Sequence, residues 1–468
     1  MTILRRKKAG FALLATAFMA TALLWSCKEK QEQKQETITV ADSTTGKKVP
    51  NMRLTLPLLD ALFYEEGFEA DLKSQLQLTG DQIQKLKTTA RGAVEQLAEE
   101  GPAGYGQSER AAVKQADEKI SSILGEAKAQ QLYQMIAHRY DNGDVAGMMP
   151  TTPNAVPTDT RVIVNAPAYR MDVFENGRLI KTYKVGIGYP EFPLPSGMRR
   201  AETIIFNPTW TPPNSPWVTG KFKPGETVAG NDKDNPLGPV KIPIGLPALI
   251  HGGKQPGKLG TFASHGCVGL TNDMIQDFAG VLSQIGGSPL SPEEIKKRQG
   301  SKTEGYKLAH PVPIELRYET MVVENGALHI YRDVYERGTN TVENAKKVLQ
   351  AYGVAFDKLP EPEKQQLLAA LREMNRDAQG NPIVADAGIP VDSAQAATPD
   401  ELAEDRKKGV SAAKQPRAKS NKVTRTVAGE KEMMVPIAGL QGKGYPAPVN
   451  YETGGTGAVA PDGKSAKK

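Results

Sequence analysis

Residues 161–188 read RVIVNAPAYRMDVFENGRLIKTYKVGIG, and this stretch decides the fold of the central part of the chain. Apolar and polar residues alternate up to Asn176-Gly177, and the alternation resumes at Leu179. Two alternating runs joined by Asn-Gly are a strong short-range signal for a β-hairpin. The short strands and tight turns that follow predict a β-rich domain, a mixed sandwich or partly closed sheet, over residues 155–337. The alternating apolar residues are Val162, Val164, Tyr169, Met171, Val173, Tyr183 and Val185.

Further along, residues 250–270 read IHGGKQPGKLGTFASHGCVGL and hold the candidate chemistry. Cys267 lies here, far from the other cysteine, Cys27, and the stretch also contains His251 and His265, two of the chain's 5 histidines. A lone thiol, nearby histidines and a glycine-rich backbone are the parts of a cysteine acyl-transfer site.

The chemistry assigns a role to each of these groups. Cys267 is the nucleophile, and an imidazole must take its proton because an unperturbed thiol is mostly protonated at neutral pH. His251 is the preferred base, since the loop that follows is long enough to fold back and bring the two side chains together. We expect residues 241–250 (KIPIGLPALI) to form one buried strand that delivers His251. The backbone N–H groups of His265, Gly266 and Cys267 are the candidates for an oxyanion hole.

A family resemblance rests on these same residues. His251, a spacer and then Ser264-His265-Gly266-Cys267-Val268 resemble the signature of the YkuD-type L,D-transpeptidases, a His followed by Ser/Thr-His-Gly-Cys. The resemblance covers about residues 155–335. Its other segments occur in the family's order: residues 161–188, residues 207–213 (NPTWTPP) and residues 235–239 (NPLGP).

The resemblance implies a peptidoglycan L,D-transpeptidase. Cys267 would form a thioester with a tetrapeptide stem and pass the acyl group to an amine, and the carbonyl of Gly252 would orient the His251 ring. We expect no cofactor and no metal. Three alternatives stay open: an L,D-carboxypeptidase that uses water as acceptor, a non-catalytic murein-binding or envelope-stress protein, and a zinc site built from His251, His265 and Cys267.

One position departs from the family pattern. Gly269 stands two residues after the cysteine, where the family commonly has Arg or Asn. Lys254 and Lys258 are possible substitutes for the missing side chain. The candidate substrate-binding residues are Ser264, Trp210 and Lys254.

The N-terminal residues 1–27 predict an export signal. Basic residues precede a short apolar run that ends at Leu24-Trp25-Ser26-Cys27, which resembles a bacterial lipobox. We therefore expect lipidation of Cys27, a tether over residues 28–51, and a protein anchored to a membrane on the periplasmic side of the cell envelope. The expected partners are peptidoglycan stem peptides and the membrane. The net charge of +6 is scattered without a basic stripe, so nucleic acid is not an expected partner.

The remaining segments predict an α+β multidomain chain. Residues 52–145 are rich in helix formers, with a capping box at Thr79 and Gln82, and they weakly resemble LTxxQ periplasmic helical proteins. The partner of this helical module is not indicated by the sequence. We expect a helical extension over residues 338–375 and a low-complexity, disordered tail over residues 376–468.

Overall fold

A computed structural model describes most of the chain, and all of the described residues lie within the unit that spans residues 50–468. The signal segment, the tether, Cys27 and Trp217 lie outside the described residues. None of the described helices combines the length and apolar character needed to cross a membrane. The described residues are 53–63, 67–95, 109–141, 150–212, 222–223, 225–245, 248–378, 380–383 and 426–453.

The first described part of the chain is helical. The predicted capping box is confirmed at the start of α3, because the Gln82 N–H donates to Thr79 Oγ1 at 3.2 Å and the Thr79 N–H donates to Gln82 Oε1 at 3.0 Å. Gly125, at φ 77°, separates α4 from α5. The apolar stripes of these helices pack on each other and form a separate hydrophobic core. The helices are α1 (Leu56–Leu62), α2 (Phe68–Ser74), α3 (Gly80–Glu95), α4 (Glu109–Leu124) and α5 (Glu126–Asp141).

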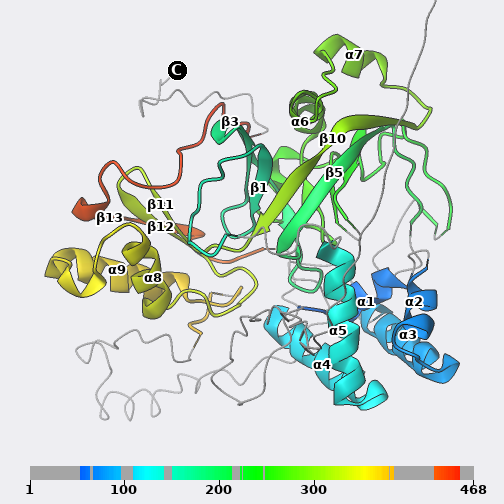
Figure 1. Cartoon of the computed structure of the whole chain (residues 1–468), viewed down its shortest axis with the longest axis horizontal. Coiled ribbons are helices and arrows are strands. Elements are labelled where there is room, and N and C mark those ends of the chain that lie inside the picture. The colour runs from blue at the N-terminus through cyan, green and yellow to red at the C-terminus, as the bar shows by residue number, and fades with distance from the viewer. Residues whose placement is uncertain are drawn as a thin grey trace, which may run out of the picture. The chain divides into compact units, whose positions relative to one another are not determined.

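The central part of the chain forms a mixed sheet, so the expected α+β class is confirmed. Among the described residues, eight strands pair in the order β3-β2-β1-β10-β5-β6-β7-β9, and Figure 1 shows β1, β10 and β5 side by side. The predicted hairpin is confirmed, with Asn176 at φ 50° and Gly177 at φ 78° in its turn. The strands are β1 (Arg161–Asn165), β2 (Arg170–Glu175), β3 (Arg178–Lys184), β5 (Gly197–Phe206), β6 (Val240–Pro243), β7 (Leu249–His251), β9 (Val268–Gly269) and β10 (Glu304–Arg317).

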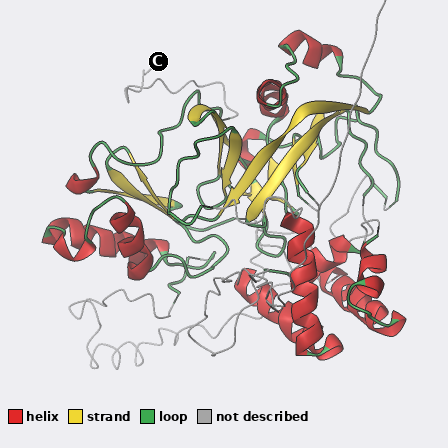
Figure 2. Cartoon of the chain, in the orientation of Figure 1, coloured by secondary structure: helices red, strands yellow, loops and turns green. Residues whose placement is uncertain are grey.

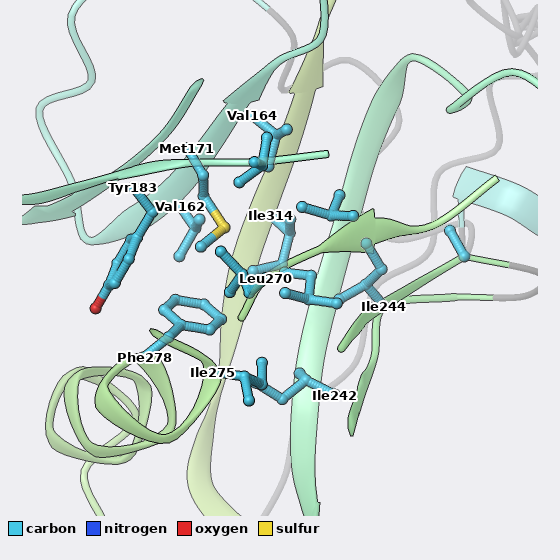
Figure 3. Close-up of a cluster of buried hydrophobic side chains, with 14 of the residues drawn as sticks. Val162, Val164, Met171, Tyr183, Ile242, Ile244, Leu270, Ile275, Phe278 and Ile314 are labelled. Atoms are coloured by element: carbon cyan, nitrogen blue, oxygen red, sulfur yellow. The ribbon is translucent and has the colours of Figure 1, made fainter. Parts of the chain in front are cut away.

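One helix covers the core face of this sheet. Helix α6 (Asn272–Ile285) begins with Thr271 as N-cap, and its apolar side is buried. Figure 3 shows Ile275 and Phe278 of α6 pointing toward Ile242 and Ile314 of the sheet. The short helix α7 (Pro292–Lys297) follows with a complete capping box. Strands β4 (Ile187–Gly188) and β8 (Phe262–Ser264) form a separate two-stranded parallel sheet. Strand β8 leads into the turn that holds Cys267.

The C-terminal part of the described chain forms a second sheet, and one of its strands lies in the segment that was predicted to be a disordered tail. Strands β11 (Met321–Glu324) and β12 (Ala327–Tyr331) do not continue the main sheet; they form a second sheet with β13 (Glu432–Pro436). The β-rich unit predicted over residues 155–337 therefore contains two separate sheets. The predicted tail also contains ordered structure, since β13 pairs with β12 and its Val435 is 1% exposed.

Two helices complete this second unit. Helices α8 (Val342–Ala351) and α9 (Glu361–Met374) lie where the helical extension was predicted, and they share a hydrophobic core with the second sheet. Figure 2 shows this pair of red helices beside the yellow strands of the second sheet. Beyond β13, the chain runs along β3, where the Thr182 N–H donates to the Val449 carbonyl and the Glu452 N–H donates to the Thr182 carbonyl. The chain therefore covers an otherwise open strand edge.

The helical module contacts the β domain through buried polar groups. Glu109, the first residue of α4, forms an ion pair with Arg337 at 2.7 Å, and their side chains are 0% and 7% exposed. Arg337 also donates to Ser196 Oγ at 2.8 Å. Thr55 Oγ1 donates to the Glu191 carbonyl at 2.8 Å. These bonds connect the helices to the loop of residues 189–196.

Candidate active site

The segment before His251 forms a hairpin instead of the single strand that we expected. Strands β6 and β7 pair antiparallel, with Lys241 opposite His251 and Pro243 opposite Leu249. The chain reverses near Gly245, which has a φ of 94°. The prediction was wrong because Gly245 interrupts the apolar run and permits a positive φ there. The consequence is that Lys241 becomes a direct neighbour of the imidazole.

The strand register brings the nucleophile and the base together. Strand β7 pairs with β9 in parallel, with Ile250 opposite Val268 and His251 opposite Gly269. Residues opposite each other share a face, so His251 shares a face with Gly269, and Cys267 lies in the bend directly before β9. Ile250 and Val268 point to the opposite, core face and are 0% exposed. The pairing thus brings the turn that holds Cys267 next to the strand that ends at His251.

A hydrogen bond fixes the tautomer of the base. The Nδ1 atom of His251 lies 2.7 Å from the Gly252 carbonyl, which can only accept a hydrogen bond, so Nδ1 carries the proton. Nε2 is then the unprotonated nitrogen and is able to accept a proton. The loop that follows is held by Asn272, whose Oδ1 accepts from the Gly253 N–H at 2.8 Å.

Burial and two cations keep the imidazole neutral. His251 is 4% exposed. Burial, Lys254 and Lys241 together lower its pKa to about 3, while the carbonyls of Gly252 and Pro236 act in the opposite direction. At neutral pH the ring is therefore a neutral acceptor of a proton.

The thiol is also held in its neutral form. Burial raises the pKa of Cys267, and a backbone hydrogen bond from Leu249 together with the charges of Lys254 and Lys241 opposes that shift. Because the thiol stays protonated and the imidazole stays neutral, the resting pair is not a thiolate–imidazolium ion pair. Proton transfer must therefore accompany the attack.

The turn that carries the nucleophile is closed by Ser264. Its hydroxyl donates to the Cys267 carbonyl at 2.5 Å and accepts from the Cys267 N–H at 3.0 Å. Ser264 is 4% exposed, and its hydroxyl braces the turn; the substrate contact that we predicted for it stays a prediction. The Cys267 N–H is occupied by this bond and does not serve the oxyanion hole in this conformation. His265 and Gly266 remain the candidates for that role.

The histidine of the turn packs against aromatic rings. The His265 ring meets Phe192 and Tyr189 edge to face, with ring centroids 4.6 Å and 5.1 Å away. Gly188 permits this packing, because a Cβ there would lie 2.2 Å from the Phe192 carbonyl oxygen and 3.0 Å from the Gly266 nitrogen. His265 therefore anchors the turn to the loop of residues 189–196.

The space beside Gly269 is filled by a lysine. A Cβ at position 269 would lie 2.8 Å from Cγ and 2.9 Å from Cε of Lys254, so the Lys254 side chain crosses this glycine. The other possible substitute, Lys258, lies exposed in the short helix η1 (Pro256–Lys258).

The remaining candidate for substrate binding, Trp210, forms an isolated β-bridge with Val228. Its backbone exchanges two hydrogen bonds with Val228, and its ring meets Phe222 edge to face at 5.5 Å. Within the described part of the chain, Trp210 makes no ring contact and no backbone hydrogen bond with Cys267 or His251. The described residues also contain no group of three or more His, Cys, Asp or Glu side chains placed to hold a metal.

Sequence reasoning missed Lys241. The signal that could have found it is the Ile-Gly-Leu-Pro run of residues 244–247, which marks a turn within the apolar segment. Folding the segment at that turn places Lys241 opposite His251.

Comparison with known proteins bears on the middle of the chain. Residues 159–308 match the model of the L,D-transpeptidase catalytic domain family YkuD. A search of curated protein sequences found no match. In the comparison with solved structures, this chain covers about half of the first one it resembles, 49% of that chain's length.

Three solved structures resemble this chain at low sequence identity. The first is the Ldtfm–avibactam carbamoyl enzyme, at 15% identity and a TM-score of 0.23, covering 34% of this chain and 49% of that one. The second is the catalytic domain of the Enterococcus faecium L,D-transpeptidase, at 16% identity and a TM-score of 0.22, covering 35% and 100%. The third is an L,D-transpeptidase from Mycobacterium smegmatis, at 15% identity and a TM-score of 0.22, covering 34% and 58%.

The order of the sequence motifs and the family match agree over the same residues. Residues 159–308 of this chain therefore match the model of the YkuD family, the L,D-transpeptidase catalytic domain.

Proposed function

We propose that this chain is a peptidoglycan L,D-transpeptidase in which Cys267 is the nucleophile and His251 the general base. The observation that supports the proposal is the parallel pairing of β7 with β9, in which His251 lies opposite Gly269 and Cys267 directly precedes β9. The Gly252 carbonyl supports it, because it holds Nδ1 and leaves Nε2 as the proton acceptor.

The first half-reaction loads the enzyme. Sγ of Cys267 attacks the carbonyl carbon of the diaminoacyl residue in a donor tetrapeptide, and the thiol proton passes to Nε2 of His251. The new C–S bond leaves an oxyanion, which the N–H groups of Gly266 and His265 stabilise. When the C–N bond breaks, Nε2 returns the proton to the departing nitrogen, and D-Ala leaves a thioester on the enzyme.

The second half-reaction reverses these steps with a new amine. The acceptor nitrogen attacks the thioester carbonyl and gives its proton to Nε2. The C–S bond then breaks, and the sulfur regains a proton from the imidazolium. An amine on a second stem would give a cross-link, an amine on a protein would anchor that protein, and water would give L,D-carboxypeptidase activity.

Intact-mass measurement tests the nucleophile. Incubation with a carbapenem should add one covalent adduct to the wild-type protein, and Cys267→Ala should abolish it. A folded, reduced wild-type sample without any adduct would favour the non-catalytic murein-binding alternative. Analysis of the products from purified disaccharide-tetrapeptide then separates cross-linking from trimming.

We also propose that the chain is exported and anchored to a membrane through a lipid on Cys27, on the periplasmic side of the envelope. The lipobox-like residues 24–27 and the preceding apolar run support this. Labelling of growing cells with an alkyne fatty acid should mark the wild-type protein and not Cys27→Ala. Equal labelling of both would contradict the anchor.

A further inference from the structure

The loop of residues 189–196 supports the nucleophile turn, which lies between β8 and β9. At the first residue of the loop, the Tyr189 N–H donates to the Ser264 carbonyl at 2.9 Å. The rings of Phe192 and Tyr189 meet the His265 ring edge to face, with centroids 4.6 Å and 5.1 Å away. Both the backbone and the side chains of the loop make these contacts, so the position of the turn depends on the position of the loop.

The helical module holds this loop at two points. Toward the start of the loop, the fully buried Thr55 donates its hydroxyl to the Glu191 carbonyl at 2.8 Å. At the end of the loop, Ser196 Oγ accepts from Arg337 at 2.8 Å. Arg337 in turn donates to both carboxylate oxygens of Glu109, the first residue of α4, at 2.7 Å and 3.0 Å. The module therefore bonds to one end of the loop directly and to the other end through Arg337.

A buried tyrosine connects these two supports to the middle of the loop. The Tyr335 hydroxyl accepts from the Leu194 N–H and donates to the Gly188 carbonyl, both at 3.0 Å, and Tyr335 is 0% exposed. The Arg337 guanidinium lies 5.2 Å from the centroid of the Tyr335 ring. The residue that links α4 to the loop thus also packs on the residue that holds the middle of the loop.

We infer that the helical module positions the oxyanion hole of the proposed enzyme through the loop of residues 189–196. The inference rests on the proposed function and deepens it. The donors proposed for the hole are the N–H groups of His265 and Gly266, which lie in the turn that the loop supports. An oxyanion hole is effective because its donors are in place before the charge develops. Thr55 and Glu109 are therefore positioning residues that act on the reaction through the loop.

Two reagents separate this positioning from the reactivity of the thiol. A carbapenem acylates Cys267 through a tetrahedral oxyanion, so its rate depends on the oxyanion hole. Iodoacetamide alkylates the same sulfur by displacing iodide, and no oxyanion forms. The ratio of the acylation rate to the alkylation rate, read from the intact mass of the full chain, therefore reports the state of the hole. A change in thiol reactivity alone alters both rates and cancels in the ratio.

Two variants each remove one bond to the loop. Thr55→Val removes the bond to the Glu191 carbonyl. Ser196→Ala removes the bond from Arg337 and leaves the ion pair of Arg337 with Glu109 intact. Each variant should lower the ratio by about 10-fold, because a small displacement of catalytic groups is costly to the rate. Thr55→Ser keeps the hydroxyl and should restore the wild-type ratio.

A matched control comes from the same helical module. The Thr55 hydroxyl also caps α1, where it accepts from the Leu58 N–H at 3.3 Å. The Thr79 hydroxyl caps α3 in the same way, by accepting from the Gln82 N–H at 3.2 Å. Thr79→Val thus removes a cap from the module and keeps both bonds to the loop, so it should leave the ratio unchanged. A loss in Thr79→Val equal to that in Thr55→Val would overturn the inference, as would unchanged ratios in both Thr55→Val and Ser196→Ala.

Amide hydrogen exchange tests the same connection without any chemistry at the thiol. In the full chain, the peptide that contains residues 262–270 should exchange faster in Thr55→Val and Ser196→Ala than in wild type and Thr79→Val. Equal exchange in all four proteins would overturn the inference, whatever the activity. A wild-type protein that iodoacetamide alkylates and a carbapenem does not acylate would contradict the proposed function, and the exchange rates would then decide the positioning by themselves.

Discussion

At the scale of single residues, the proposed mechanism makes the reaction of the Cys267 thiol depend on the imidazole of His251. Its Nδ1 is bonded to the Gly252 carbonyl, and its Nε2 is the proton acceptor. We predict that His251→Gln lowers the rate of carbapenem acylation at Cys267 by about 10²- to 10⁴-fold, because the general base is lost. His310→Gln, on an exposed part of strand β10, is the matched control and should react at the wild-type rate. Equal rates for both variants would remove His251 from the mechanism.

The same ring makes stability depend on pH. Its pKa falls from 6.5 to about 3 on folding because of burial and of the charges of Lys254 and Lys241. The unfolded chain therefore binds a proton that the folded chain does not, so stability falls as pH drops from about 6.5 toward 3. We predict a loss of about 2 kcal/mol from this residue between neutral pH and pH 5. Urea unfolding of wild type and His251→Gln at both pH values measures it, and identical pH dependence would contradict it.

At the scale of the element, the nucleophile turn between β8 and β9 depends on one hydroxyl. Ser264 both donates to and accepts from the Cys267 backbone. We predict that Ser264→Ala lowers the free energy of unfolding by about 1–3 kcal/mol, because it leaves the partly buried Cys267 N–H without its partner. It should also slow alkylation of Cys267 by iodoacetamide. Ser264→Thr keeps the hydroxyl and should stay close to wild type; equal losses in both variants would point to packing instead of the hydrogen bonds.

The elements also show where prediction from the sequence succeeds. The Asn176-Gly177 hairpin, the Thr79 capping box and the Thr271 N-cap are local, because neighbours in the chain make their bonds. The β6–β7 hairpin was missed since its residues are apolar on both arms and resemble one buried strand. That error concealed Lys241, because its closeness to His251 exists only once the turn is made.

At the scale of the whole described unit, a buried ion pair joins the helical module to the β domain. Glu109 and Arg337 are almost fully buried, and the Arg337 guanidinium lies 4.0 Å from the Tyr318 ring centroid. We predict that Glu109→Ala lowers the free energy of unfolding by about 3–5 kcal/mol, because it leaves a buried charge uncompensated. The exposed pair Glu343–Lys347 is the control; its loss should cost less than about 1 kcal/mol. A small effect of Glu109→Ala in denaturant unfolding would mean that water hydrates the Arg337 guanidinium once Glu109 is removed.

The second sheet is completed by a strand from the far end of the chain. Val435 of β13 is 1% exposed, and its neighbour Met434 is 58% exposed. We predict that Val435→Ala lowers the midpoint of thermal unfolding through a loss of about 1–3 kcal/mol, because it opens a cavity in the core shared with α8 and α9. Met434→Ala should change the midpoint little. Comparable shifts for the two variants would show that β13 does not contribute to that core.

The sequence by itself determined the candidate nucleophile and the candidate base, the helical and β-rich regions and the turns between neighbouring segments. Each depends on residue type and short spacing, which act through bonds between residues close in the chain. Only the tertiary structure decided that Lys241 and Lys254 flank His251, that the Cys267 N–H is occupied by Ser264, and that β13 closes a second sheet. These features depend on strand register and on contacts between distant segments, and such contacts form only when the whole chain packs.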